Sequence, residues 1–103
     1  TPVFHHGMDI VARAGSPVVA SASGTVVKSG FEALLGNVVV LDHGSGHRSV
    51  YAHMSERAVE EGAFVARGET LGKVGNSGRT TGPHLHYEVR VNGLPVNPAR
   101  FLN

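Results

Sequence analysis

The sequence of 103 residues contains no cysteine and no tryptophan, and its aromatic side chains are four Phe and two Tyr. Without cysteine the chain can form neither a disulfide nor a thiolate zinc site, and it has no cysteine nucleophile. The longest apolar stretch, Val38 to Leu41, is far too short to cross a membrane. Charged residues are spread along the chain with a formal net charge of +1, so no basic run indicates nucleic-acid binding and no acidic tail indicates disorder.

The length and the 41% apolar content suit a single domain, which we assign to residues 1–103. Turn signals rich in glycine recur about every eight to twelve residues, and short β-branched runs lie between them. We therefore predict an all-β fold, an antiparallel β-sheet sandwich with few or no helices. The predicted strands are 18–21, 25–29, 38–42, 48–53, 63–66, 70–74 and 85–91, with a tight turn at Asn92-Gly93. Single helical turns are expected at 55–59 and 97–101.

Histidines at the two ends of the chain carry the most specific chemical pattern. His84 and His86 flank Leu85, and alternate residues of a strand project from the same face. By the same period His5 and Asp9 share a face, with Gly7 between them. Two imidazoles and one carboxylate would leave one position of a tetrahedral zinc open, which is typical of a catalytic zinc and not of a structural one.

Other polar residues can be explained either by a structural role or by a role in a functional site. His6 alternates away from the face of His5, and His43 and His47 lie in glycine-rich turns, so packing or surface positions explain them. Glu88 continues the face of His84 and His86, where it either orients a ligand imidazole or pairs with Arg90 or Arg48. His53 is expected to share a face with Tyr51. The polar run 79–82 either borders a substrate groove or is plain loop.

Three motifs in order extend this pattern to a known family. The chain reads His5-x-Gly7-x-Asp9-Ile10, then Tyr51-Ala52-His53-Met54, then Gly82-Pro83-His84-Leu85-His86-Tyr87-Glu88-Val89. This order closely resembles the lysostaphin-like (LytM-like) zinc metallopeptidases, which cleave peptide cross-links of bacterial peptidoglycan. The resemblance covers nearly the whole chain.

The resemblance implies a zinc endopeptidase with a β-sheet groove and Zn²⁺ on its floor. His5, Asp9 and His86 would bind the zinc, and His53 and His84 would be the two catalytic histidines. No His-Glu-x-x-His motif supplies a glutamate base, so His84 is the expected base. The implied partners are peptidoglycan stem peptides and cross-links, and the implied location is the periplasm or the cell exterior.

The resemblance also leads us to expect residues 1–103 to be a catalytic domain within a longer protein. Family members usually have further strand and loop before the first ligand, so one wall of the groove would lie outside this chain.

Two alternatives belong to other functional classes. Some relatives of this family have lost zinc ligands and activate other cell-wall hydrolases without catalysis, although all the ligands and both histidines are present here. The segment 61–71 is similar to half of a lipoyl or biotinyl carrier module. A carrier needs a lysine on an exposed hairpin tip, and neither Lys28 nor Lys73 lies in that setting.

Overall fold

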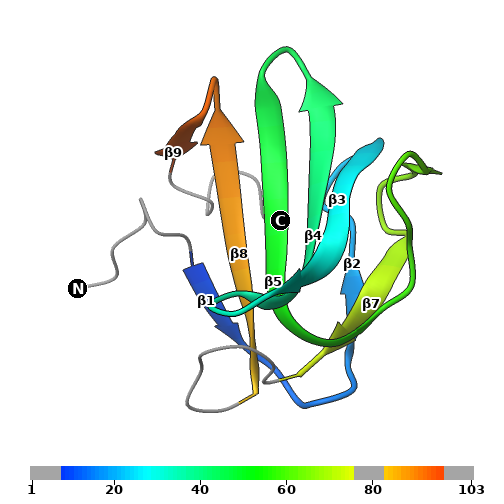
Figure 1. Cartoon of the computed structure of the whole chain (residues 1–103), viewed down its shortest axis with the longest axis vertical. Coiled ribbons are helices and arrows are strands. Elements are labelled where there is room, and N and C mark those ends of the chain that lie inside the picture. Colours follow the sequence, from blue (N-terminus) through cyan, green and yellow to red (C-terminus); the bar gives the residue numbers. More distant parts are fainter. Residues whose placement is uncertain (1–7, 76–82, 97–103) are drawn as a thin grey trace.

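The fold is a single antiparallel β-sheet that bends around its own core (Figure 1). The computed structural model describes residues 8–75 and 83–96, and within these ranges it contains nine strands and no helix. The strands are β1 (Met8–Val11), β2 (Pro17–Val19), β3 (Gly24–Glu32), β4 (Gly36–Gly44), β5 (His47–Arg57), β6 (Phe64–Val65), β7 (Thr70–Val74), β8 (His84–Val91) and β9 (Leu94–Val96). None of the described segments has the helical length and apolarity that a membrane crossing requires.

The path through the sheet runs β1-β8-β5-β4-β3-β6. β5 is the longest strand, and it serves both layers of the fold. Its first part lies between β4 and β8, whereas Glu56 and Arg57 near its end pair with β7, which in turn pairs with β2. β2 and β7 therefore lie side by side, at the lower right of Figure 1, and close the sandwich.

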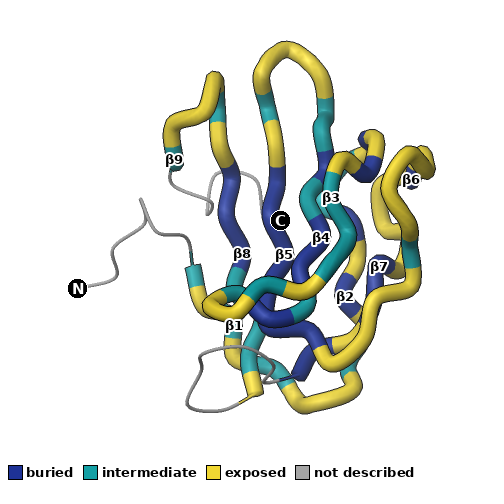
Figure 2. The backbone as a smooth tube through the Cα atoms, in the orientation of Figure 1, coloured by how far each residue is buried: buried dark blue, intermediate teal, exposed yellow. Residues whose placement is uncertain are grey.

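The main core fills the space between these two layers. Buried residues run along the middle of β8, β5 and β4, as the colouring of Figure 2 shows. The largest fully buried ones are Tyr51, Tyr87, Leu41, Met54 and Leu71. Each aliphatic or aromatic side chain of this kind contributes roughly 1.5–3 kcal/mol by leaving water.

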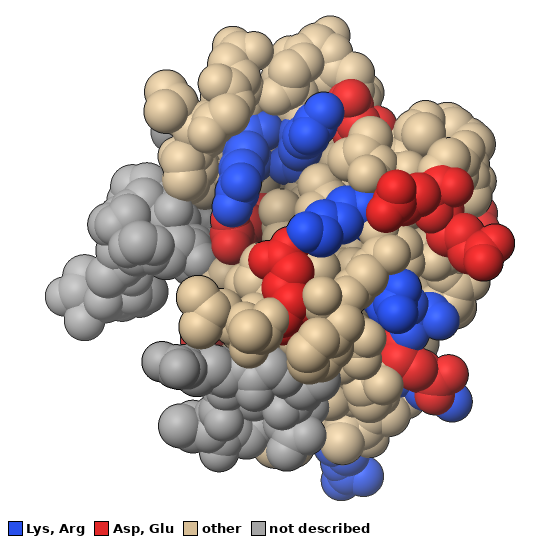
Figure 3. Space-filling view, in the orientation of Figure 1, with Lys and Arg blue, Asp and Glu red and all other residues tan. Residues whose placement is uncertain are grey.

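The opposite face of the main sheet carries a smaller apolar cluster. Val38, Val50 and Ala52 are buried there, with Leu35 and Val40 packed against them. β4 and β5 are therefore covered on both faces in their middle, which explains their unbroken apolar runs. Lys and Arg side chains gather over β8, β5 and β3 on this face, which is the one in view in Figure 3.

The predicted all-β sandwich is confirmed, and so is the strand at 70–74. The turn at Asn92-Gly93 is confirmed too, because both residues have the positive φ angles of a two-residue hairpin turn. β9, the second strand of this hairpin, was not among the predicted strand ranges. The predicted helical turn at 55–59 is wrong, because β5 continues to Arg57 and its backbone pairs with β7. The helical turn expected at 97–101 lies outside the described residues.

Gly72 lies where the backbones of β7 and β5 approach each other closely, so a substitution there tests this contact. A Cβ at this position would lie 2.2 Å from the Glu56 carbonyl oxygen, so one backbone would have to move. Gly72→Ala should lower the free energy of unfolding by about 1–3 kcal/mol in a denaturant titration. Gly30→Ala is the matched control, since a Cβ there would meet nothing within 4 Å. Equal stability of the two variants would contradict the close approach.

Candidate metal centre

The centre begins with the pairing of β1 and β8. Asp9 lies directly opposite His86 in this antiparallel register. As a result, the Asp9 Oδ1 and His86 Nδ1 atoms are 2.8 Å apart, although 77 positions of sequence separate the two residues. The sequence-based expectation that the early carboxylate and the late imidazole meet is therefore met in the geometry.

His84 joins this pair from the same face of β8. Its Nε2 atom lies 3.7 Å from Asp9 Oδ1. The side chains of His84 and His86 are 17% and 16% exposed, whereas that of Asp9 is 64% exposed, so solvent reaches the site past the carboxylate. The two imidazoles thus form the inner part of the site, and the carboxylate stands at its opening.

Glu88 holds the far side of the His86 ring. Its Oε2 atom lies 2.9 Å from His86 Nε2, and its Oε1 atom accepts hydrogen bonds from Nε and Nη2 of Arg90 at 3.1 and 2.8 Å. The sequence left open whether Glu88 orients an imidazole or pairs with an arginine, and the structure shows that it does both. His86 is consequently fixed between two carboxylates, and Arg90 braces the buried one.

These contacts set the charge states of the pair. The hydrogen bond to Glu88 raises the pKa of His86 above its ordinary value, burial opposes this, and the hydrogen bond to Asp9 adds to the increase. Burial alone would raise the pKa of Glu88, but the hydrogen bonds from His86 and Arg90 outweigh it and lower that pKa. Glu88 is therefore ionised at neutral pH and accepts a hydrogen from the Nε2 atom of His86. The Nδ1 atom then faces Asp9 as the position where a proton or a metal can be held.

His53 reaches the same site through an irregularity in β5. The pairing of β4 with β5 shifts register between Asn37 and Val39, and His53 has a φ of 62°, which is uncommon for a residue other than glycine. Its backbone N–H donates to the Leu35 carbonyl at 2.7 Å. The His53 ring centroid lies 5.2 Å from that of His84 and 5.8 Å from that of His86.

The expectation that Tyr51 shares a face with His53 is therefore wrong. Tyr51 packs in the main core against Tyr87, with ring centroids 5.3 Å apart, whereas His53 turns to the side of His84 and His86. A regular strand would have placed the two side chains together. The bulge breaks that alternation and adds a third imidazole to the site.

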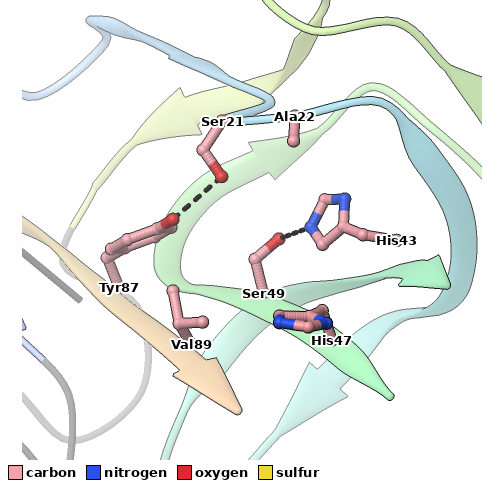
Figure 4. A pocket seen from close by; sticks show the side chains of 7 residues that line it. All are labelled: Ser21, Ala22, His43, His47, Ser49, Tyr87 and Val89. Atoms are coloured by element: carbon pink, nitrogen blue, oxygen red, sulfur yellow. Dashed lines mark hydrogen bonds between the residues drawn. The ribbon is translucent and has the colours of Figure 1, made fainter. Parts of the chain in front are cut away.

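His43 belongs to a pocket of about 220 Å³ on the core side of the sheet (Figure 4). Its Nε2 atom lies 2.6 Å from Ser49 Oγ, and its Nδ1 atom donates to the Ser23 carbonyl at 2.8 Å. Hydrogen bonds continue from Ser49 through Tyr51 and Ser21 to Tyr87. Burial, the largest cause, raises the pKa of Tyr87 to about 12, against the hydrogen bond to Ser21. These contacts agree with the prediction that His43 has a structural role.

The donor types present suit zinc, which binds imidazole nitrogen and carboxylate oxygen. Within residues 8–75 and 83–96, however, no three His, Asp or Glu side chains form a group arranged around one metal position. His5, the expected third ligand, lies outside the described residues, as do His6 and the run 79–82. The sequence named Arg90 as a possible partner of Glu88, but only as an alternative to a role for Glu88 at the site. The structure shows that the contact with Arg90 and the contact with His86 occur together.

Comparison with known proteins gives a consistent result. Residues 3–98 match the family model described as peptidase family M23. The DD-carboxypeptidase/endopeptidase Mpg of Neisseria meningitidis is 49% identical over 95 residues, which cover 92% of this chain and 22% of that protein. The peptidoglycan DD-endopeptidase ShyC of Vibrio cholerae is 44% identical over 91% of this chain and 22% of its own length. The chain thus spans about a fifth of these relatives.

Two solved structures extend the likeness to the fold. A zinc-containing peptidase from Vibrio cholerae superposes with a TM-score of 0.87 and 36% identity, over 90% of this chain and 29% of that one. The catalytic domain of the antimicrobial peptidase lysostaphin from Staphylococcus simulans gives a TM-score of 0.88 and 35% identity, over 94% of this chain and 77% of that one. Both neighbours therefore resemble this chain in sequence as well as in fold.

Ser49 connects His43 to the tyrosines, so its hydroxyl should matter for stability. Ser49→Ala would leave the partly buried His43 and the buried Tyr51 each short of a partner, and we expect a loss of about 1–3 kcal/mol in the free energy of unfolding. Ser16→Ala, in the turn before β2, is the control and should change stability by less than about 0.5 kcal/mol. Thermal and denaturant unfolding measure both variants. A stability for Ser49→Ala equal to that of the control would count against a structural role for the network.

Proposed function

The chain belongs to peptidase family M23, and on this premise we propose that it is a zinc-dependent endopeptidase that hydrolyses peptide cross-links of bacterial peptidoglycan. The observation that carries the proposal is the meeting of Asp9 Oδ1 with His86 Nδ1, with His84 and His53 beside them. The names of the relatives, which include a peptidoglycan DD-endopeptidase, favour the D-alanyl link to the diamino acid as the bond that is cleaved. The proposed place of action is the periplasm or the cell exterior.

In this proposal His5, Asp9 and His86 hold the zinc. His86 would bind it through Nδ1, because its Nε2–H is directed at Glu88. Zinc, when bound, polarises the peptide carbonyl and lowers the pKa of a coordinated water toward about 7. Glu88 and Arg90 keep the His86 ring in one orientation and one tautomer, so the ligand atom is set before the metal arrives.

The two remaining histidines perform the proton chemistry. His84 lies next to Asp9 and takes the proton of the attacking water, which a neutral imidazole can do near pH 7. His53 donates a hydrogen bond to the oxygen of the scissile carbonyl as negative charge develops on it. Its 6% exposure keeps it from bulk water, which strengthens that interaction.

Separate removal of the two histidines of β8 tests these roles. His86→Ala should lose both zinc and hydrolysis, because it removes a ligand. His84→Ala should retain zinc and lower kcat by about 10²–10⁴-fold, because it removes only the base. Zinc content by elemental analysis and the release of fragments from purified peptidoglycan by mass spectrometry measure the two effects.

His47→Ala is the matched control, since His47 lies in the turn region at the other end of β5. It should keep both zinc and activity. Hydrolysis by His84→Ala at the parental rate would show that another group is the base. A wild-type zinc content below about a tenth of an equivalent after supplementation would favour the non-catalytic activator instead.

Glu88 provides a prediction for metal affinity alone. Glu88→Gln should weaken zinc binding by about 10–100-fold, because the amide is a weaker acceptor for His86 Nε2–H and leaves Arg90 without its carboxylate. Competition with a chromogenic chelator gives the affinity. Glu56→Gln, exposed at the end of β5, should leave it unchanged. An unaltered affinity in Glu88→Gln would mean that the carboxylate does not support the ligand.

A further inference from the structure

We propose that a hollow lined by Arg48 and Arg90, on the face of the sheet that carries His84 and His86, binds a carboxylate of the substrate peptide. This inference rests on the proposed function, because it extends the same face of the sheet that carries His84 and His86. This hollow, called the groove below, has a volume of about 390 Å³ and an apolar floor that includes Val38, Val40 and Val50. Lys28, Arg48 and Arg90 contribute the cations around it.

The pairing of β5 with β8 places the two guanidinium groups together. Arg48 lies directly opposite Arg90 in the antiparallel register, and both side chains line the groove. Like charges directly opposite each other on one face of a sheet are unfavourable. An anion between them would remove this cost, so the position favours a negatively charged ligand.

Neighbouring carboxylates satisfy the two arginines only in part. Arg90 uses Nε and Nη2 for Glu88, so its Nη1 group remains available within the described part of the chain. Arg48 contacts Asp42 at 3.7 Å, beyond hydrogen-bond distance, and its side chain is 53% exposed. Lys28 differs, because it is paired with Glu32. The hydrogen-bond donors available in the groove are therefore mainly those of the Arg48 guanidinium group, together with Nη1 of Arg90.

The spacing from the metal centre suits a peptide substrate. Arg90 follows His86 by four positions on β8, which corresponds to about 13 Å along the strand. An extended peptide advances by about 3.3–3.6 Å per residue. A substrate that lies along β8 with its scissile bond at His86 therefore places a group about four residues away at the arginines. Peptidoglycan stem peptides carry acidic residues, so the ligand that we assign to this position is one of their free carboxylates.

A pair of stem peptides that differ only in amidation tests the assignment. One has free carboxylates and the other has carboxamides at the same positions, and both are monomeric, so they lack the cleavable link. Binding to the zinc-loaded protein that carries this chain is measured by NMR titration. We expect the amidated peptide to bind about three- to tenfold more weakly, because Arg48 is half exposed and solvent screens its charge.

Arg48→Gln assigns this preference to a residue. It should weaken binding of the free-carboxylate peptide by the same factor and leave the amidated peptide unchanged, whereas Arg48→Lys should retain part of the preference. Arg67→Gln, in the exposed turn before β7, is the matched control and should bind both peptides like the wild type. With cross-linked substrate, the change in Arg48→Gln should appear in KM and not in kcat.

Equal binding of the two peptides by the wild type, or no measurable binding of either, would overturn the inference. So would an undiminished preference in Arg48→Gln. These binding measurements do not depend on hydrolysis, so they test the carboxylate site separately from the proposed endopeptidase activity. Carboxylate-dependent binding without any hydrolysis would contradict the proposed endopeptidase function and leave the groove assignment in place.

Discussion

The antiparallel register between β1 and β8 is the constraint on which the site depends. It sets Asp9 opposite His86 and brings a carboxylate from the start of the chain to an imidazole near its end. Strand alternation then places His84 and Glu88 on the same face, on either side of His86. A shift of this register by one residue would turn Asp9 to the other face and separate the donors, so the pairing of two strands specifies the chemistry.

A second layer of contacts makes the site rigid. Glu88 is buried, and it can remain charged there because His86 and Arg90 both donate to it. The same strand thus supplies the inner imidazole, its carboxylate support and the arginine that compensates the carboxylate. Because these groups alternate along β8, they lie in a line on one face of the sheet, from the candidate metal centre toward the arginines of the groove. The orientation of His86 and the charge of the groove are consequently parts of one hydrogen-bonded structure.

The sequence was enough to predict the all-β fold and its regular strands, but not the places where a strand departs from regular alternation. Period-two alternation was enough to group His84 with His86, because β8 is regular. It failed at His53, where a bulge and a positive φ reverse the side chain, since a bulge depends on the pairing with β4 and leaves no local signal. The error at 55–59 has a similar origin, because only contact with β7 makes that segment extended. For Glu88 the sequence offered an imidazole or an arginine as partner, because alternation places both on one face and does not show that one carboxylate contacts both.

The position of β1 has a consequence for how the centre can be lost. This strand has four residues, stands at one end of the sheet path and pairs with β8 alone among the described strands. The main core lies between the other strands, with Ile10 touching it only from the periphery. Detachment of β1 therefore costs much less than global unfolding. Among the described strands, β1 is thus the one whose local fraying would remove the carboxylate donor of the candidate centre while the rest of the sheet stays intact.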